Sequence, residues 1–329
     1  MLVSGRQGIE LHIISASRRT DIPHYFADWF RERRRARFAE YRTVFGGGKK
    51  GAPRASLDPG DVLGYLFWTK YAAPFHDELK ALRSECIAYV FQYTITGYGK
   101  EIQPGIPERD VAIDDFLRIA DTLPGAAAIQ WRYDPILISP EYSCDWHRKN
   151  FTRIAHQLQG HTQVVNVSFV EPYLKALAKA LDWKEIRWRR PDPERHKTVL
   201  KKYPGLQTIG ADEHALLADM SRIAQEQGIQ LRICCDNEFA SNFPSASCCG
   251  SELFKPYGDD LLMKVSALAP APSRPGCRCL KTVDIGMDTT CPAGCFYCYV
   301  NTSRDRARMN YEQHDPTATM LRKSSNESR

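Results

Sequence analysis

Three cysteines near the end of the chain have the residue type and the spacing of a metal-binding loop. Cys291, Cys295 and Cys298 form a C-x3-C-x2-C array, and Gly294 lets the backbone turn between them. Iron–sulfur clusters are normally held by four cysteine thiolates. Three closely spaced thiols leave a four-iron cluster one ligand short. The array therefore predicts either a distant fourth ligand or an iron left open for chemistry.

A second group of cysteines is spread over three places upstream. Adjacent cysteines occur at 234–235 and 248–249, and a C-x-C stands at 277–279. Four of these sulfurs could hold a second cluster. Our preferred set takes one sulfur from each of the first two places and both from the third: Cys234, Cys249, Cys277 and Cys279. The substitutes are Cys235 and Cys248. Two alternatives stay open, namely that one of these cysteines is the fourth ligand of the triplet, or that the group binds zinc.

The cysteine content also bears on the cellular compartment. Residues 1–10 are polar and lack the apolar region of a signal peptide, so we expect a cytoplasmic protein. In a reducing compartment, clustered cysteines are typically metal-binding or catalytic. Zinc is the main alternative to an iron–sulfur cluster at the triplet, because cysteine-rich arrays bind zinc readily. A disulfide knot is the other alternative.

Short apolar runs alternate with helical patterns along most of the chain. We expect strands at residues 11–17, 38–45, 62–68, 88–96, 126–131, 164–169, 229–234 and 281–286. We expect helices after residues 23 and 74, at about 108–123 and 145–158, from 172, and at 212–227 and 299–310. This alternation predicts an α/β fold whose parallel sheet is closed, or nearly closed, as a (β/α) TIM-like barrel.

Polar and charged side chains stand where the predicted strands end. In barrels of this kind the chemistry gathers at those ends. The residues placed there are Ser15, Ser17, Arg18, Trp68, Lys70, Gln92, Thr94, Thr96, Arg132, Asp134, Ser168, Cys234 and Cys235. Side chains repeat every second residue along a strand, so Gln92 and Thr94 share one face. If that face points inward, the mouth of the barrel is polar. For each residue singly, packing or capping is the alternative.

The composition allows a large core and gives little sign of a particular partner. The chain has 329 residues, of which 43% are hydrophobic, and a formal charge of +6. The positive charge is local, with an arginine-rich run at 31–37 and a basic tail at 304–329. A solvated helix end explains the run, and a nucleic-acid patch is the alternative. No apolar run reaches membrane-spanning length.

The triplet and its aromatic neighbours resemble the radical SAM superfamily. The extended form C-P-x-G-C-x-Y-C-Y is most similar to the branch that contains spore photoproduct lyase. Most of the chain also resembles an uncharacterised family, domain-of-unknown-function family 1848. Its members begin with a strand followed by S-R-R-T-D-I-P and end in C-P-x-G-C-x-Y-C-Y-x-N. The matching segments here are residues 17–23, 67–70, 131–135, 284–286 and 291–301.

The superfamily resemblance implies a [4Fe-4S] cluster on Cys291, Cys295 and Cys298, with its open iron bound to S-adenosylmethionine. One-electron reduction, by a partner such as flavodoxin or ferredoxin, would cleave S-adenosylmethionine to methionine and a 5′-deoxyadenosyl radical. That radical would take a hydrogen atom from a substrate that the sequence does not identify. The lyase branch points to nucleic acid as the substrate, but the absence of a strong basic stripe weakens that hint.

Further residues are expected to bind the substrate and S-adenosylmethionine. The anion anchors, and the carboxylates that orient them or receive an ammonium group, are Arg18, Lys70, Arg132, Asp21 and Asp134. The cofactor-binding candidates are Ser15, Ser17, Arg19, Gln92, Thr94 and Tyr297. Of these, Tyr297 is expected to shield the cluster.

The proline-rich stretch at 267–275 divides the chain in two. Residues 1–266 are expected to form the barrel, and residues 267–329 to carry the triplet and complete it. In radical SAM barrels the strand, cluster loop and helix form the first unit, whereas here they come last, so the resemblance requires a circularly permuted barrel. Two other functions stay open. One is an iron–sulfur electron-transfer or redox-sensing barrel with four protein ligands at every iron, and the other is a zinc-stabilised barrel protein.

Overall fold

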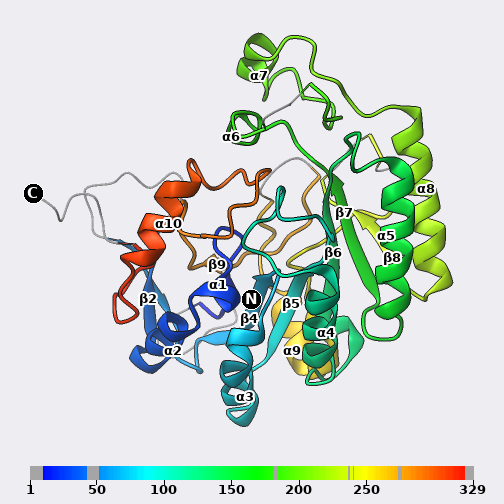
Figure 1. Ribbon diagram of the computed structural model, residues 1–329. Helices are drawn as coiled ribbons and strands as arrows, with labels where there is room; N and C mark the ends of the chain where they lie inside the picture. The colour runs from blue at the N-terminus through cyan, green and yellow to red at the C-terminus, as the bar shows by residue number, and fades with distance from the viewer. Residues whose placement is uncertain are drawn as a thin grey trace, which may run out of the picture.

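A parallel sheet lies at the centre of the molecule (Figure 1). The computed structural model describes residues 10–42, 52–180, 184–235, 238–239, 241–272 and 276–322. Within these residues seven strands are hydrogen-bonded in the order β8-β7-β6-β5-β4-β1-β9, each parallel to its neighbours. Their bounds are β1 His12–Ala16, β4 Val62–Thr69, β5 Tyr89–Thr94, β6 Ile129–Ile136, β7 Val164–Phe169, β8 Gln230–Ile233 and β9 Val283–Asp284.

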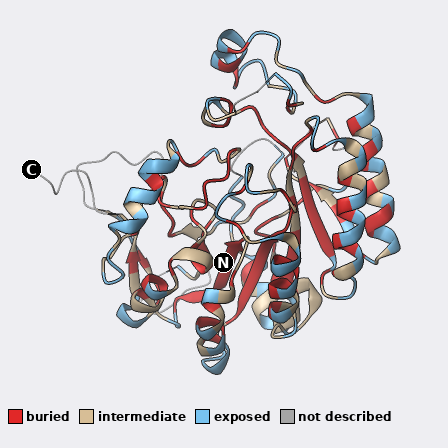
Figure 2. Ribbon diagram, in the orientation of Figure 1, coloured by how far each residue is buried: buried red, intermediate tan, exposed pale blue. Residues whose placement is uncertain are grey.

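Helices connect the strands, and most of the long helices cover one face of the sheet (Figure 1). The α-helices are α1 Ile22–Tyr25, α2 Ala27–Ala36, α3 His76–Ser84, α4 Arg109–Ala120, α5 Cys144–Gln157, α6 Leu174–Leu177, α7 Lys197–Lys202, α8 Ala211–Glu226, α9 Asp259–Ser266 and α10 Arg304–Glu312. Short 3-10 helices are η2 Ala73–Phe75, η3 Ala126–Ala128 and η4 Ser251–Tyr257. Figure 2 shows that the central strands are buried, whereas the outer faces of the helices are exposed.

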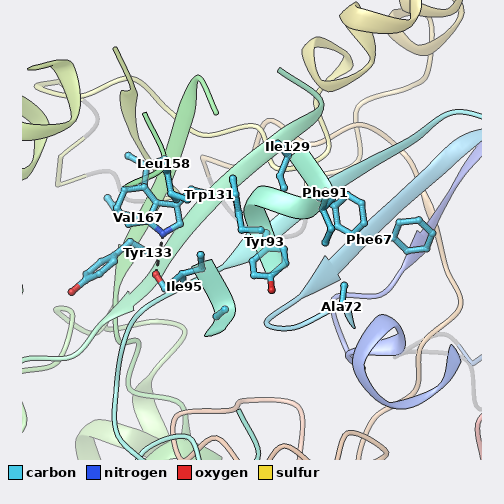
Figure 3. Close-up of a cluster of buried hydrophobic side chains, with 14 of the residues drawn as sticks. Phe67, Ala72, Phe91, Tyr93, Ile95, Ile129, Trp131, Tyr133, Leu158 and Val167 are labelled. Atoms are coloured by element: carbon cyan, nitrogen blue, oxygen red, sulfur yellow. Dashed lines mark hydrogen bonds between the residues drawn. The ribbon is translucent and has the colours of Figure 1, made fainter. Parts of the chain in front are cut away.

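Alternate side chains of each strand form the core beneath these helices (Figure 3). Phe67, Phe91, Trp131 and Val167 come from four neighbouring strands and are each 0% exposed. The Trp131 indole donates a hydrogen bond to the carbonyl oxygen of Ile95 at 2.9 Å, which satisfies the polar atom that this side chain buries. The remaining alternate positions must therefore face the other side of the sheet.

The other side of the sheet is apolar mainly near the amino ends of the strands. There Ile13, Leu66 and Val90 pack against Leu253 and Phe254 of η4. Gly64 allows this approach, since a Cβ at that position would lie 2.7 Å from the Phe254 ring. The carboxyl ends on the same side carry polar residues, which are described below.

The α/β class and the parallel sheet predicted from the sequence are confirmed. The prediction that residues 38–45 add a strand to that sheet is wrong. The strand β2, Phe38–Glu40, pairs antiparallel with β3, Arg54–Ser56, in a separate two-stranded sheet. Residues 43–45 lie outside the described residues. A three-residue strand has too little hydrophobic period to show which sheet it joins.

The two edges of the main sheet are β8 and β9. No ladder joins them among the described residues. The segment 244–249 lies between them instead, because Ile233 donates to the carbonyl of Pro244 at 2.9 Å and Leu280 donates to that of Cys249 at 3.3 Å. The closed barrel remains a prediction, whereas the parallel sheet is established.

Candidate functional site

Buried amides cross the middle of the sheet on the face opposite the helices. Gln92 on β5 donates to Gln130 on β6 at 2.7 Å, and Asn166 on β7 donates to both of them, at 3.1 and 2.7 Å. Thr94 is buried two residues beyond Gln92 on the same strand. The prediction that this face is polar is therefore correct. The nitrogen and the oxygen of the Gln92 side-chain amide both form hydrogen bonds with these neighbouring amides.

Asp284 on β9 organises the end of β1. Its carboxylate accepts hydrogen bonds from Ser17 Oγ at 2.7 Å and from the backbone N–H of Arg18 at 3.1 Å. The Arg19 guanidinium lies 3.4 Å from the same carboxylate and also donates to the backbone of Arg42 at 2.9 Å. Ser17 and Arg19, which were predicted to bind the cofactor, are thus engaged in joining β1 to β9.

The sequence did not single out Asp284 as a site residue. Its segment, residues 284–286, was visible only as a stretch shared with the resembled family. Gly286 in that segment has a clear physical reason, because a Cβ there would lie 1.8 Å from Ser17 Oγ. The tight contact between β1 and β9 requires a glycine at this position.

Two of the predicted anion anchors lie close to the same tryptophan. The guanidinium carbons of Arg18 and Arg132 are 5.9 and 4.9 Å from the ring centroid of Trp68. The indole N–H donates to Ser15 Oγ at 3.0 Å, which engages another predicted cofactor-binding residue. The structure therefore brings Arg18, Arg132 and Ser15 together at the ends of β1, β4 and β6.

Arg132 is held by a carboxylate on its own strand. Its guanidinium forms an ion pair with Asp134, which also accepts a hydrogen bond from Ser168 on β7. Although burial lowers the pKa of Arg132, the neighbouring Asp134 carboxylate raises it, and the net pKa is raised. Arg132 Nε is buried and has no hydrogen-bond partner among the described residues. The guanidinium therefore retains a donor for a further acceptor.

Asp21 fixes the end of β4. It accepts hydrogen bonds from Thr69 Oγ1 at 2.7 Å and from the backbone N–H of Lys70 at 2.9 Å. It also caps α1 through the backbone N–H of His24, at 3.1 Å. Burial raises the pKa of Asp21 to about 7, against the effect of these donors. Asp21 thus positions Lys70 through its backbone.

The Lys70 ammonium is buried beside the cysteine triplet. Nζ lies 5.6 Å from the ring centroid of Tyr297 and has no hydrogen-bond partner within the described part of the chain. Burial lowers the pKa of Lys70, and the nearby Cys295 opposes that shift. Tyr297 in turn accepts a hydrogen bond from Gln103, a residue that the sequence did not single out. An anion is the natural complement of this ammonium group.

The triplet loop packs over the carboxyl ends of the strands. Cys291, Cys295 and Cys298 gather in one cluster with Ile106 and Ala293. Burial raises the pKa values of Cys291 and Cys295.

Hydrogen bonds from four parts of the chain hold this loop in place. Gly105 donates to the carbonyl of Ala293 at 2.9 Å, Lys179 to that of Cys298 at 2.5 Å, Asn301 to that of Cys291 at 2.7 Å, and Asn310 to that of Thr289 at 2.6 Å. Gly105 and Lys179 lie far from the loop in the sequence, whereas Asn301 and Asn310 follow it closely. The loop is therefore fixed both by tertiary contacts and by the segment that comes after it.

The upstream cysteines also meet, as the sequence predicted. The Cys279 thiol lies near those of Cys248, Cys249 and Cys277, and the Cys248 thiol also lies near that of Cys234. The preferred set is thus gathered in one place, with Cys248, a substitute in the prediction, as a further member. The other substitute, Cys235, lies 3.7 Å from Cys234, sulfur to sulfur.

In neither thiol group are the described side chains arranged around a point where a single metal ion could bind. Over the described ranges, no group of three or more His, Cys, Asp or Glu side chains is arranged to hold a metal ion. The donor chemistry suits a metal centre at both places, because thiolates are ligands for zinc and for iron–sulfur clusters. The cations beside them would balance the charge of metal-bound thiolates.

One protein family accounts for most of the chain. The sequence model of a family described as Domain of unknown function (DUF1848) matches residues 13–300. The chain belongs to this family. The match runs from β1 past the triplet, so it includes both thiol groups and crosses the predicted domain boundary at 266–267. The resemblance to DUF1848 is thereby confirmed, and the link to the radical SAM superfamily stays a prediction.

Other comparisons add little for this DUF1848 protein. No curated protein sequence matches it. A mannonate dehydratase from Streptococcus suis serotype 2 is similar at 14% identity and a TM-score of 0.28, with 59% of each chain covered. The chain thus spans under two thirds of that structure, and a likeness this low carries no argument. No helix in the described part of the chain is long and apolar enough to cross a membrane.

Proposed function

We propose that this DUF1848 protein is an iron–sulfur enzyme of radical SAM type. The observation that carries the proposal is the buried Lys70 ammonium, which lies beside Cys295 without a hydrogen-bond partner among the described residues. A buried cation without compensation costs free energy. An anionic centre on the three thiols would compensate it.

Cys291, Cys295 and Cys298 would hold a [4Fe-4S] cluster, and one iron would be left for S-adenosylmethionine. In a four-iron cube each cysteine binds a different iron, so the three sulfurs need not surround a common point as they do around zinc. When bound, the cluster supplies the electron that cleaves S-adenosylmethionine and starts radical chemistry.

The chain's own residues would bind, orient and shield the reactants. Lys70, Arg132 and Arg18 offer cations at the strand ends for the anionic groups of S-adenosylmethionine and of the substrate. Their carboxylate neighbours limit where these cations can point, since Arg132 is paired with Asp134. Tyr297 covers one side of the triplet. The cluster of apolar residues around the three thiols would exclude water from the centre.

The strand order supports the circular permutation that this function requires. Ile14 and Ser15 on β1 pair in parallel with Val283 and Asp284 on β9. The last strand therefore occupies the position before the first, and strand, cysteine loop and α10 precede β1 around the sheet. A closed barrel would additionally require β8 to join β9 through the segment 244–249.

Anaerobic purification tests the proposal through iron, sulfide and product analysis. We expect the wild-type protein to contain iron and acid-labile sulfide, and Cys295→Ala to lose most of what the triplet binds. Cys86→Ser, which changes an exposed cysteine away from both thiol groups, is the matched control. With dithionite and S-adenosylmethionine, the wild type should release methionine and 5′-deoxyadenosine. Colourless, iron-free protein, or undiminished iron in Cys295→Ala, would overturn the proposal.

A further inference from the structure

The second thiol group lies at the gap between the two edges of the sheet. Cys248, Cys249 and Cys279 are 4%, 2% and 7% exposed, and Cys234 and Cys277 pack against the same cluster. Their segments come from the end of β8, from the loop that follows it, and from the approach to β9. Buried thiols from three separate segments are thus brought into contact where no ladder joins the described strands.

The backbone around these thiols is fixed by hydrogen bonds. Ala246 donates to the carbonyl of Ile233 on β8 at 2.8 Å, which positions the loop that carries Cys248. Ser247 Oγ donates to the carbonyl of Arg278 at 2.9 Å, which ties that loop to the C-x-C segment. The cysteines therefore meet through a defined backbone path and not by chance packing of loose ends.

We propose that Cys248, Cys249, Cys277 and Cys279 bind one zinc ion as a tetrahedral thiolate site that links β8 to β9. This inference goes beyond the proposed radical chemistry and does not rest on it. Sulfurs that share one zinc lie about 3.8 Å apart when the Zn–S distance is about 2.3 Å, whereas sulfurs on a four-iron cube are held farther apart. The Cys279 thiol lies close to three other thiols in one buried cluster, which favours the shorter spacing.

The sulfurs now meet in pairs, with Cys279 as the common member. Rotation about the Cα–Cβ bond moves a cysteine sulfur while its backbone stays in place. Such rotations would turn the sulfurs toward a shared centre. Cys234 contacts the group through Cys248, and we place it outside the four ligands.

Two cations stand beside the group and suit bound thiolates. Arg132 interacts with Cys248 and Cys234, and Arg18 interacts with Cys249 and Cys279. Four thiolates on a divalent ion carry a net charge of about −2, which the two guanidinium groups would offset in part, since Arg132 also pairs with Asp134.

Zinc analysis of a variant that lacks the triplet tests this inference. The variant Cys291→Ala/Cys295→Ala/Cys298→Ala lacks the proposed iron–sulfur site. Zinc binding by this variant therefore tests the second thiol group independently of the proposed function. We expect this triple variant, purified with Zn²⁺, to retain about one zinc ion per chain after desalting. Co²⁺ in its place should give the absorption bands of a tetrahedral thiolate complex.

Adding Cys279→Ser should abolish zinc retention, whereas adding Cys86→Ser or Cys234→Ser should leave it unchanged. Because Cys279→Ser risks misfolding, the Co²⁺ spectrum of the folded triple variant decides the matter without a further substitution. Folded triple variant that holds no zinc, that holds iron and sulfide instead, or that gives a Co²⁺ spectrum without thiolate bands would overturn the inference.

Discussion

At the scale of single residues, the decisive feature is a buried cation that has no hydrogen-bond partner among the described residues. Lys70 Nζ lies against the Tyr297 ring and close to Cys295, and its position is set by the bond from its own backbone N–H to Asp21. Residues that cost stability in the empty protein are common at functional sites. Lys70 fits that pattern because its buried Nζ would gain a hydrogen-bond acceptor when an anion occupies the site.

Lys70→Met should separate stability from function. In the metal-free protein we expect the free energy of unfolding to rise by about 1–2 kcal/mol, because an unsatisfied buried donor is removed. Release of 5′-deoxyadenosine by the loaded enzyme should fall at the same time. Urea titration and product analysis measure the two effects. Lys80→Met, an exposed lysine on α3, is the control and should change neither. A destabilised Lys70→Met protein with full turnover would contradict this role.

His147 gives the fold a dependence on pH that is separate from the site. The imidazole is 0% exposed and hydrogen-bonded to the carbonyl of Leu137 at 2.9 Å and to Tyr133 Oη at 2.7 Å. Burial lowers its pKa from 6.5 to about 4. The unfolded chain therefore binds the proton more readily, and stability present above pH 6.5 is lost as the pH falls through about 4.

A shift of this size means that about 3 kcal/mol of stability is lost as the pH falls from 6.5 to about 4. The stability of His147→Gln should therefore fall less than that of wild type between pH 7 and pH 4. Urea titrations at the two pH values measure the difference. His156→Gln, on the exposed face of the same helix, controls for the loss of an imidazole. Equal pH dependence in wild type and His147→Gln would refute the assignment.

Some site residues could be predicted from the sequence and others could not, for a physical reason. The cysteines are readable because ligand type and spacing are local properties. Arg18, Lys70 and Arg132 are readable because strand ends can be located from hydrophobic runs. Asp284 is not, since its partners on β1 lie more than 260 residues away and nothing local indicates the contact.

At the scale of elements, the closest packing near the site is between the β1 and β9 segments. Gly286 is required there because Ser17 Oγ occupies the space of its side chain. Gly286→Ala should destabilise the protein by about 1–3 kcal/mol through overpacking, measured by urea titration. Gly210→Ala, where a Cβ meets nothing closer than 3.8 Å, is the control. A Gly286→Ala protein as stable as that control would show that β9 is not packed as described.

The strands of the main sheet and the long helices could be predicted from the spacing of hydrophobic residues, because each of these elements buries one continuous face. The element at 38–40 did not, since β2 and β3 are three residues each and pair with one another outside the main sheet. Pairing partners depend on tertiary contacts that a single short segment does not encode. The sequence predicts that β9 lies beside β1 only through the expected circular permutation of the barrel.

At the scale of the whole molecule, the C-terminal segment is part of the sheet. β9 pairs with β1, and Ile285 and Met287 belong to the same core as Phe67 and Phe91. A chain that ends at residue 266 would lose this strand, these core side chains and the carboxylate of Asp284. We expect it to lack the cooperative thermal unfolding of the full chain, as followed by circular dichroism. A truncated chain that unfolds cooperatively at the full-length temperature would contradict this dependence.

The central claim is that the triplet holds an iron–sulfur cluster with one iron open to S-adenosylmethionine. Electron paramagnetic resonance of the anaerobically reduced protein, recorded with and without S-adenosylmethionine, tests it most directly. We predict a reduced-cluster signal whose g values shift on addition of S-adenosylmethionine and which is absent from Cys295→Ala. A cluster signal that S-adenosylmethionine leaves unchanged would contradict the claim and indicate an electron-transfer or redox-sensing protein with four ligands at every iron.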